Sequence, residues 1–307
     1  MASTLRAGVL GAGVFGGYHA AKYAGRSDVS LTAVFDPHPD RAEAMATRFG
    51  ARAAPDMASL FSEIDILSIT SPAHTHAAAA LAALAAGKHV YVEKPVATSL
   101  EDADAIVAAG ARRGVVVACG FLERAAFQAM NLFEIGEAPL RLEAVRRGPP
   151  SPRSLDVSVV MDLMIHDLDL ALALSKAPAL AVEARGACIA NRSFDEAHAE
   201  VTFEDGFTAR LTASRVAEGR ERTMRLVFPS GEVSIDFLTH RFENTTTFPL
   251  NAAFEETPAG QDRLGASLAA FLAAVRGEAP APLADAKDGA RALDLALAVE
   301  QAVVDGA

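Results

Sequence analysis

The sequence has no tryptophan and only two cysteines, and aromatic residues make up 6% of a chain that is 51% hydrophobic. We therefore expect a core built mostly from Ala, Val and Leu. The 307 residues are enough for roughly two domains. Cys119 and Cys188 lie in apolar, strand-like surroundings. They predict buried, reduced thiols in a cytoplasmic protein rather than a disulfide framework.

The sequence also lacks any apolar run of the ~18 residues that a membrane span needs. No charged region followed by a cleavage site precedes the first strand, so we predict no signal peptide. The net charge of −11 argues against general binding to nucleic acid or to anionic membranes. We therefore predict neither a nucleic-acid nor a membrane partner.

A glycine-rich turn near the N-terminus is the strongest local signal. A short apolar run ends near Leu10, and a helical pattern covers Val14–Ala24. Between them, Gly11 suits a tight turn, Gly13 allows a diphosphate to approach, and Gly16 allows the helix to pack closely on the strand. The helix N-terminus then faces the diphosphate. The predicted nucleotide contacts at this turn are Gly11, Gly13, Val14, Phe15 and Gly16.

A second apolar run, Leu31–Phe35, ends in Asp36, whose carboxylate is placed to bind the adenosine ribose hydroxyls. The alternative is that Asp36-Pro37 only turns the chain. Because a carboxylate repels a 2′-phosphate, NAD is favoured as cofactor. NADP stays possible because Arg41 is close in sequence.

Strands and helices alternate up to about residue 120, which predicts a doubly wound parallel sheet in a nucleotide-binding domain, 1–120. Ligands of such sheets bind beyond the carboxyl ends of the strands. Further cofactor contacts are expected in segments at or near those ends, namely Thr70, Ser71, Pro72, His76, Glu93 and Lys94.

The sequence pattern changes after about Phe121. Alternating apolar runs and hairpin signals at Asp205-Gly206 and Ser230-Gly231 predict a largely antiparallel sheet in this part of the chain. We expect a helix over Glu123–Glu134 and assign 121–307 to an α+β domain for substrate binding. Its two C-terminal helices, Asp262–Val275 and Asp285–Val304, have room to pack back on the first domain. The predicted class is α/β with a second, mostly antiparallel domain.

Three ionisable residues stand out in the predicted helix Val159–Leu174, which is apolar nearly all round. Asp162, His166 and Asp169 have the spacing i, i+4, i+7 and so share one helix face. Ionisable groups in a buried helix are costly unless they are paired or functional. An internal His–Asp pair is the alternative, and a metal site ranks lowest because no other clear ligands occur, so we predict no metal.

Glu93-Lys94-Pro95 follows the fifth predicted strand, at the nicotinamide end of the crevice. A lysine there is suited to bind a substrate hydroxyl or relay its proton, although lysine before proline is often only a surface charge. If the second domain packs over the crevice, Lys94 and His166 meet across it. A histidine titrating near neutrality suits the role of base.

These motifs together closely resemble the Gfo/Idh/MocA family of oxidoreductases. The matching segments are Gly11–Gly16, Ser71-Pro72-x-x-Thr75-His76, Ala86–Pro95 and Asp162-x-x-x-His166-x-x-Asp169. The resemblance implies a Rossmann domain, an open-faced sheet domain that often forms homodimers or homotetramers, and NAD(P)-dependent oxidoreduction of a sugar or polyol. It further implies that Lys94 and His166 are the catalytic pair and that Asp162 orients His166 or the substrate.

One departure from the usual pattern of the family bears on which substrate is expected. Many family members have glycines before the helix Asp, whereas this chain has Val159-Val160-Met161. The run Asp162–Asp169 is similar to the UDP-N-acetylglucosamine 3-dehydrogenase subgroup, which implies oxidation of the C3 hydroxyl of UDP-N-acetylglucosamine. An unlinked sugar or inositol is the runner-up, and a non-catalytic NAD(P)-binding sensor is the alternative of another class.

A nucleotide sugar needs cations for its diphosphate, and arginines near the predicted helix and on the sheet are candidates. Most of them are explained equally well by a solvated sheet face. Arg215 and Arg222 flank a predicted loop and are the favoured pair. The complete set of predicted substrate contacts is Lys94, Arg124, Asp162, His166, Arg215 and Arg222, and the other arginines considered are Arg146, Arg147, Arg153, Arg220 and Arg225.

Overall fold

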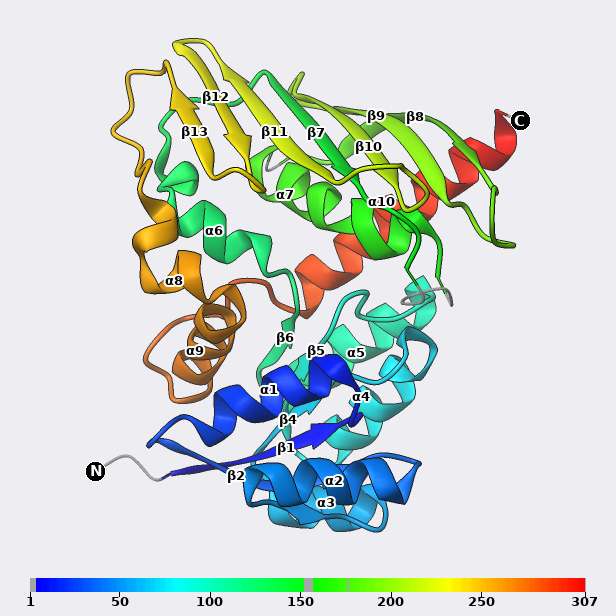
Figure 1. The fold of residues 1–307 in the computed structure, drawn as a ribbon, viewed down its shortest axis with the longest axis vertical. Helices are drawn as coiled ribbons and strands as arrows, with labels where there is room; N and C mark the ends of the chain where they lie inside the picture. Colours follow the sequence, from blue (N-terminus) through cyan, green and yellow to red (C-terminus); the bar gives the residue numbers. More distant parts are fainter. Residues whose placement is uncertain (1–3, 152–156, 176, 307) are drawn as a thin grey trace. The chain divides into compact units, whose positions relative to one another are not determined.

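The computed structural model describes residues 4–151, 157–175 and 177–306, and within them the strands form two sheets (Figure 1). Contacts divide the chain into two compact units. The first unit comprises residues 1–121 and 264–290, and the second comprises 122–263 and 291–307. The predicted fold class, a parallel Rossmann-type sheet and a mostly antiparallel sheet with helices, is confirmed.

The first unit is built on a parallel sheet with the strand order β3-β2-β1-β4-β5-β6. Its strands are β1 (Leu5–Leu10), β2 (Val29–Phe35), β3 (Arg52–Ala53), β4 (Ile66–Ile69), β5 (His89–Val92) and β6 (Val117–Cys119). Its helical segments include α1 (Val14–Ala24), α2 (Pro39–Phe49), α3 (Met57–Glu63), the 3₁₀ turn η1 (Ala73–Thr75), α4 (His76–Ala85) and α5 (Leu100–Arg113). The two-residue strand β3 was not predicted, because so short a segment has no periodicity to read.

Local signals explain why these helices begin and end where they do. Pro39 opens α2, and Gly50 closes it in the left-handed region at φ 71°. The Ser99 side chain accepts a hydrogen bond from the Asp102 backbone N–H, which caps α5. The segment from Leu264 belongs to this unit through α9 (Arg263–Val275): the Tyr91 hydroxyl lies 2.8 Å from Ser267 Oγ, and the Tyr91 ring contacts Phe271.

The second unit contains a sheet with the strand order β13-β12-β11-β7-β10-β9-β8. All of its paired strands are antiparallel except β7 and β10, which run parallel. The strands are β7 (Arg141–Arg147), β8 (Ala179–Ala187), β9 (Glu196–Phe203), β10 (Thr208–Ser214), β11 (Glu221–Phe228), β12 (Gly231–Asp236) and β13 (Arg241–Asn244). Strand β13 was not predicted.

Burial alternates along these strands, so one face of the sheet is apolar and covered. Helix α7 (Ile165–Ser175) runs along that face (Figure 1). The other helical segments of this unit are α6 (Glu123–Ala129), η2 (Leu132–Glu134), η3 (Val160–Met164), η4 (Phe254–Glu256), α8 (Pro258–Gln261) and the end of α10 (Ala286–Asp305). No helix in the described ranges is both long and apolar enough to cross a bilayer.

Three expectations need correction. The helix expected over Glu123–Glu134 is broken, because Asn131 takes a left-handed conformation with φ 64° between α6 and η2. The first turn of the helix expected from Val159 is the π-helical turn η3, not α-helix. Cys188 was expected to be buried but is exposed, because it lies in the loop just after β8, whereas Cys119 is buried as predicted.

Candidate functional site

The turn between β1 and α1 has the geometry predicted for a dinucleotide site. Gly11 has φ +102°, and a Cβ there would lie 2.7 Å from the Ser71 backbone nitrogen. A Cβ on Gly16 would lie 1.9 Å from the Gly11 carbonyl oxygen, so the helix approaches the strand as closely as glycine allows. Gly13 faces open space, with nothing within 4 Å of a built Cβ. This opening in front of a tightly packed turn fits a diphosphate.

The N-terminus of α1 supplies donors for such an anion. Gly13 is its N-cap residue, no side chain caps the helix, and its first turn contains no acidic residue. The backbone N–H groups of the first turn are therefore available to an anion, and the helix dipole favours negative charge there. Val14 and Phe15, the first two residues of this helix, are 52% and 41% exposed.

Asp36 follows β2 and ties its end to the glycine turn. Its Oδ2 accepts a 2.8 Å hydrogen bond from the Ala12 backbone N–H, and its Oδ1 accepts one of the same length from His38. Each carboxylate oxygen keeps a second lone pair, so this arrangement remains compatible with ribose hydroxyls. Arg41, which could have favoured NADP, is an exposed residue of α2.

The loop after β4 is held by its own polar side chains. Thr70 Oγ1 donates to the Leu10 and Gly11 carbonyl oxygens at 3.0 and 2.9 Å, and Ser71 Oγ lies 2.6 Å from Thr75 Oγ1. Pro72 precedes η1 at the end of this loop. Thr70 therefore reinforces the glycine turn, since it bonds directly to the Gly11 carbonyl.

His76 links this loop to the next one. It is 1% exposed; its Nδ1 lies 2.7 Å from the Pro95 carbonyl oxygen, and its Nε2 lies 2.8 Å from that of Ser71. Burial lowers the pKa of His76, and the two carbonyl oxygens oppose this effect. We predicted His76 as a cofactor contact; the geometry gives it a positioning role between two loops instead.

Glu93, Lys94 and Pro95 follow β5, with a cis peptide bond between Lys94 and Pro95. Lys94 is half-buried, whereas Glu93 is only 7% exposed. His19 Nε2 lies 3.0 Å from Glu93 Oε1. His19 was not among the predicted site residues; the available signal was a histidine three residues after Gly16, on the helix face that packs against the sheet.

In the second unit, the candidate residues lie on η3 and α7. Asp162 belongs to the π-helical turn, and both Asp162 and His166 are half-buried. Such turns frequently occur at functional sites. Asp169 is different: it is 1% exposed and receives hydrogen bonds of 2.9 and 2.7 Å from Nε and Nη2 of Arg124. Arg124 was predicted to bind substrate, but this bidentate pair gives it a structural role.

Arg215, also a predicted substrate contact, is 7% exposed and surrounded by acceptors within the second unit. It does flank the predicted loop, since β10 ends at Ser214. Its Nε donates to Asp195 Oδ1, Nη1 to the Val157 carbonyl and Nη2 to Ser193 Oγ, each at 2.8 Å. The structure thus uses Arg215 to hold the loop before β9.

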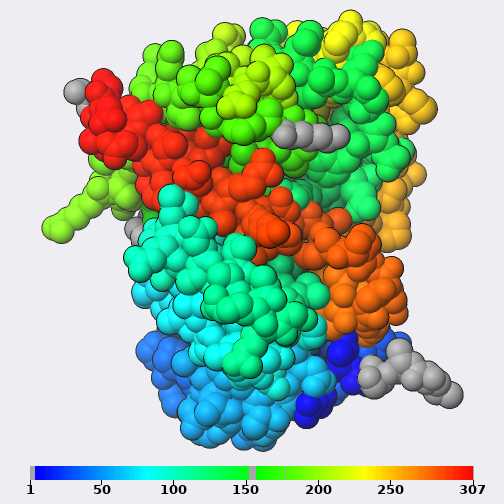
Figure 2. All heavy atoms as spheres, turned by 180° about the vertical axis from the view of Figure 1, so that it is seen from behind, coloured from blue at the N-terminus to red at the C-terminus, as the bar shows by residue number. Residues whose placement is uncertain are grey.

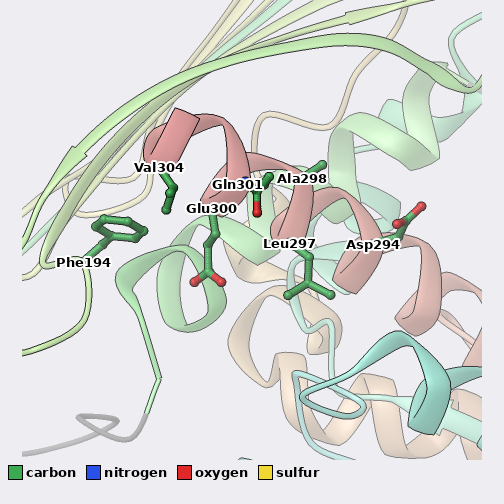
Figure 3. A pocket seen from close by; sticks show the side chains of 7 residues that line it. All are labelled: Phe194, Asp294, Leu297, Ala298, Glu300, Gln301 and Val304. Carbon is green, nitrogen blue, oxygen red and sulfur yellow. The ribbon is translucent and has the colours of Figure 1, made fainter. Parts of the chain in front are cut away.

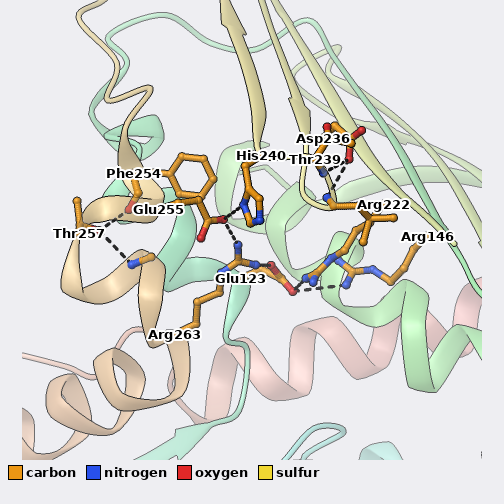
Figure 4. A network of polar contacts seen from close by, with 12 residues as sticks. Glu123, Arg146, Arg222, Asp236, Thr239, His240, Phe254, Glu255, Thr257 and Arg263 are labelled. Carbon is orange, nitrogen blue, oxygen red and sulfur yellow. Dashed lines mark hydrogen bonds and ion pairs between the residues drawn. The ribbon is translucent and has the colours of Figure 1, made fainter.

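Arg222 lies in a cluster of charges centred on Glu123 (Figure 4). Its Nη2 contacts Glu123 Oε1, and its guanidinium lies over the Phe237 ring, 5.2 Å from the centroid. Arg263 donates to Glu123 Oε2 at 3.0 Å. Burial, together with the charge of Arg263, lowers the pKa of Arg222 to about 10. Among the described residues, Arg222 Nε is a buried donor without a partner.

The cluster is nearly neutral as it stands. Arg146 bonds to Asp167 through Nη2 at 2.8 Å, and Arg263 bonds to Glu255 at 2.9 Å. Three arginines thus face three carboxylates, and an anionic ligand of Arg222 would have to compete with Glu123. Of the other arginines considered, Arg225 pairs with Glu143 and Glu232 on the sheet, and Arg153 lies outside the described residues.

A pocket of about 530 Å³ opens beside the last turns of α10, which form part of the molecular surface (Figures 2 and 3). Its lining residues are Phe194, Asp294, Leu297, Ala298, Glu300, Gln301 and Val304, all in the second unit. None of these lining residues is a predicted site residue. Within the described ranges, no group of three or more His, Cys, Asp or Glu residues could hold a metal ion.

Comparison with known proteins identifies the family. The profile of the Gfo/Idh/MocA oxidoreductases with an NAD-binding Rossmann fold matches residues 5–121, and that of the family's C-terminal domain matches 143–234. A UDP-N-acetylglucosamine 3-dehydrogenase of Acidithiobacillus ferrooxidans is 39% identical over 97% of both chains. This chain belongs to the Gfo/Idh/MocA family. It is an NAD-dependent oxidoreductase, and residues 5–121 match the NAD-binding Rossmann domain of the family.

Two solved structures and one further dehydrogenase sequence are also similar to this chain. The structure of the same A. ferrooxidans enzyme has a TM-score of 0.90 and 37% identity, covering 99% of this chain and 98% of that one. Inositol 2-dehydrogenase 3 of Saccharopolyspora erythraea is 34% identical over 54% of this chain and 52% of its own. WlbA dehydrogenase of Bordetella pertussis, solved with NADH and UDP-GlcNAcA, is similar in fold, with a TM-score of 0.89 and 21% identity over 99% of this chain and 97% of that chain.

Proposed function

We propose that this NAD-dependent oxidoreductase oxidises the C3 hydroxyl of UDP-N-acetylglucosamine. The observation that carries the proposal is the match to a dehydrogenase of that substrate over 97% of both chains. Binding of NAD by this chain is supported by three features of the β1–α1 turn: the open space in front of Gly13, the uncapped N-terminus of α1 and the Asp36 carboxylate. Bound there, NAD would accept the hydride that an alcohol oxidation releases.

The residues of this chain then handle the proton and orient the alcohol. We propose that His166 takes the proton of the reacting hydroxyl as general base and that Lys94 donates a hydrogen bond to the same oxygen. Asp162, one turn before His166, orients that imidazole or the sugar. Arg222 is the arginine that we retain as a substrate contact, because it keeps a buried donor without a described partner.

An unlinked sugar or inositol is the second candidate substrate, and one feature of the second unit favours it. Arg124, Arg215 and Arg222, the three predicted arginine contacts, all have carboxylate partners already. A diphosphate would have to displace Glu123 from Arg222 or rely on backbone donors. An inositol or free sugar makes no such demand.

The discriminating experiment measures NADH absorbance with NAD and either UDP-N-acetylglucosamine, N-acetylglucosamine or myo-inositol. We expect turnover with the nucleotide sugar at submillimolar concentration and little with the other two. Turnover with inositol alone would transfer the proposal to the second candidate. No NADH from any of the three at millimolar concentration would remove both. We also expect a homodimer or homotetramer, which the mass in solution tests.

The base assignment has its own test. Replacing His166 with Asn should lower kcat by roughly a hundredfold or more while leaving NAD affinity unchanged, because a general base contributes about 10²–10⁴ in rate. His198→Asn is the matched control, since His198 contacts Thr212 and Glu196 on the sheet. Equal turnover in the wild type and His166→Asn would show that another group is the base.

A further inference from the structure

A buried chain of hydrogen-bonding groups connects α1 to the ends of β4 and β5 in the first unit. The Tyr23 hydroxyl lies 2.8 Å from Ser68 Oγ, Ser68 Oγ lies 2.9 Å from His19 Nδ1, and His19 Nε2 lies 3.0 Å from Glu93 Oε1. Tyr23, His19 and Ser68 are completely buried, and Glu93 is 7% exposed. Burying four polar groups is costly unless each has a partner, so the pattern requires an explanation.

The chain has a single direction when Glu93 is a carboxylate. The carboxylate only accepts, so His19 must donate from Nε2, and a neutral imidazole then accepts at Nδ1. Ser68 therefore donates to His19, and Tyr23 donates to Ser68. Every contact then has one donor and one acceptor, and the tautomer of His19 follows from this assignment. All the donors point, step by step, toward Glu93.

The Glu93 carboxylate is also fixed on its other side. A Cβ on Gly120, just after β6, would lie 2.8 Å from Glu93 Oε2 and 3.0 Å from Oε1. The carboxylate therefore lies directly against the Gly120 backbone, with His19 at Oε1. A glutamate that was only a surface charge would need neither the buried imidazole nor the glycine.

Lys94 is held between two such anchors. On one side, Glu93 is bound to His19; on the other, the Pro95 carbonyl contacts His76 Nδ1 at 2.7 Å. His76 in turn contacts the Ser71 carbonyl in the loop after β4. The residues on both sides of Lys94 are therefore tied by buried imidazoles, Glu93 to α1 and Pro95 to the loop after β4.

We propose that His19 and Glu93 are a positioning pair that fixes Lys94 for its role toward the substrate hydroxyl, an inference that rests on the proposed function of Lys94. The pair acts through the backbone and needs no contact with the reacting atoms. Small misplacements of a catalytic group lower the rate by up to about a hundredfold while leaving cofactor binding intact.

The test compares His19→Asn, Glu93→Gln and the double variant. We expect each single variant to lower kcat by about tenfold to a hundredfold. In His19→Asn, whose side chain is completely buried and was not predicted to contact the cofactor, the NADH dissociation constant, measured by fluorescence titration, should stay within twofold of the wild type. Because the two residues act as one unit, the double variant should be no more than about threefold worse than the poorer single variant. Tyr91→Phe is the matched control: it removes a buried hydroxyl bonded to Ser267, keeps the ring that packs edge-on against His19, and should leave kcat unchanged.

A second readout separates this inference from the proposed function. Acetylation of Lys94 with limiting acetic anhydride, followed by peptide mass spectrometry with Lys88 as internal reference, needs no substrate. We expect the Lys94 rate relative to Lys88 to change severalfold in His19→Asn and Glu93→Gln but not in Tyr91→Phe. If the wild type oxidises no sugar yet the Lys94 rate changes in this way, the proposed function fails and the positioning pair stands. Unchanged labelling, or a fall in kcat of His19→Asn matched by an equal loss of NADH affinity, would overturn the positioning pair.

Discussion

Two buried carboxylates, one in each unit, are held in opposite ways. Asp195 in the second unit is completely buried and accepts hydrogen bonds from the backbone N–H groups of Ile189, Ala190 and Asn191, from the Asn191 side chain and from Arg215. Glu93 in the first unit has, among the described residues, the single side-chain partner His19. A carboxylate surrounded by donors holds a loop in place. A carboxylate with a single donor, next to a lysine in the sequence, is suited to fix the position of that lysine.

The difference predicts different consequences of mutation. Loss of the Asp195 charge should lower stability without a specific effect on turnover. Loss of the Glu93 charge should lower kcat clearly and have only a small effect on the free energy of unfolding. The predictions that follow test whether this contrast holds, beginning with the largest expected change in stability.

Asp195→Asn should destabilise the second unit by about 3 kcal/mol, because it leaves the buried Arg215 without its carboxylate. The midpoint of thermal unfolding reports the loss. Glu200→Gln is the control, since it breaks an ion pair with Arg210 on the exposed face of the same sheet. A specific fall in kcat for Asp195→Asn, with an unchanged midpoint, would contradict the structural role of Asp195 and Arg215.

The Asp195 contribution should depend on pH. Burial opposes ionisation, but the hydrogen bonds from Asn191, Arg215 and Ala190 outweigh it and hold the Asp195 pKa well below its ordinary 3.8. A carboxyl group with a lowered pKa stabilises the fold above its ordinary pKa and loses that contribution as the pH falls. The difference in stability between wild type and Asp195→Asn should therefore be constant above about pH 5 and shrink progressively below pH 4. A difference that grows on acidification would contradict this assignment.

Several element boundaries in the first unit could be predicted because their signals are local, although β3 was not predicted and the domain predicted as 1–120 lacks residues 264–290 of this unit. The β1–α1 boundary, the Ser99 cap and the glycine that ends α2 are each specified within a few positions. Nothing local predicts η3, since a π-helical turn has no characteristic pattern in the sequence. The sequence therefore placed Asp162 and His166 on one helix, but not the change of helix type between them.

The arginine roles were less predictable, because their partners are distant in the sequence. Arg222 contacts Glu123 across 99 residues, and Arg124 contacts Asp169 across 45. A pattern of basic residues cannot distinguish a substrate contact from one half of a buried ion pair. The His19–Glu93 contact, 74 residues apart, was missed for the same reason.

Gly120→Ala should displace the Glu93 carboxylate without altering any residue that bonds to Glu93. The added Cβ would lie 2.8 Å from Glu93 Oε2, so the carboxylate must shift away from its place beside His19. We expect a loss of about 1–2 kcal/mol in stability, typical of an overpacked buried site, and a fall in kcat like that of Glu93→Gln. Gly17→Ala is the control in the same unit, because its added Cβ meets only the Met45 side chain at 3.9 Å. Normal turnover in Gly120→Ala would mean that the position of Glu93 does not matter to Lys94.

Tyr23→Phe tests the far end of the same chain and should have the smallest effect. It removes the donor to Ser68 Oγ but leaves Ser68 able to donate to His19, so the His19 tautomer and the Glu93 contact persist. We expect a loss of about 1 kcal/mol, the usual net value of one hydrogen bond, and kcat within twofold of the wild type. The result also distinguishes two ways in which the chain could work. If Tyr23→Phe lowered kcat as much as Glu93→Gln, the four groups would have to act together as a path for protons, because positioning alone depends only on the two members nearest Lys94.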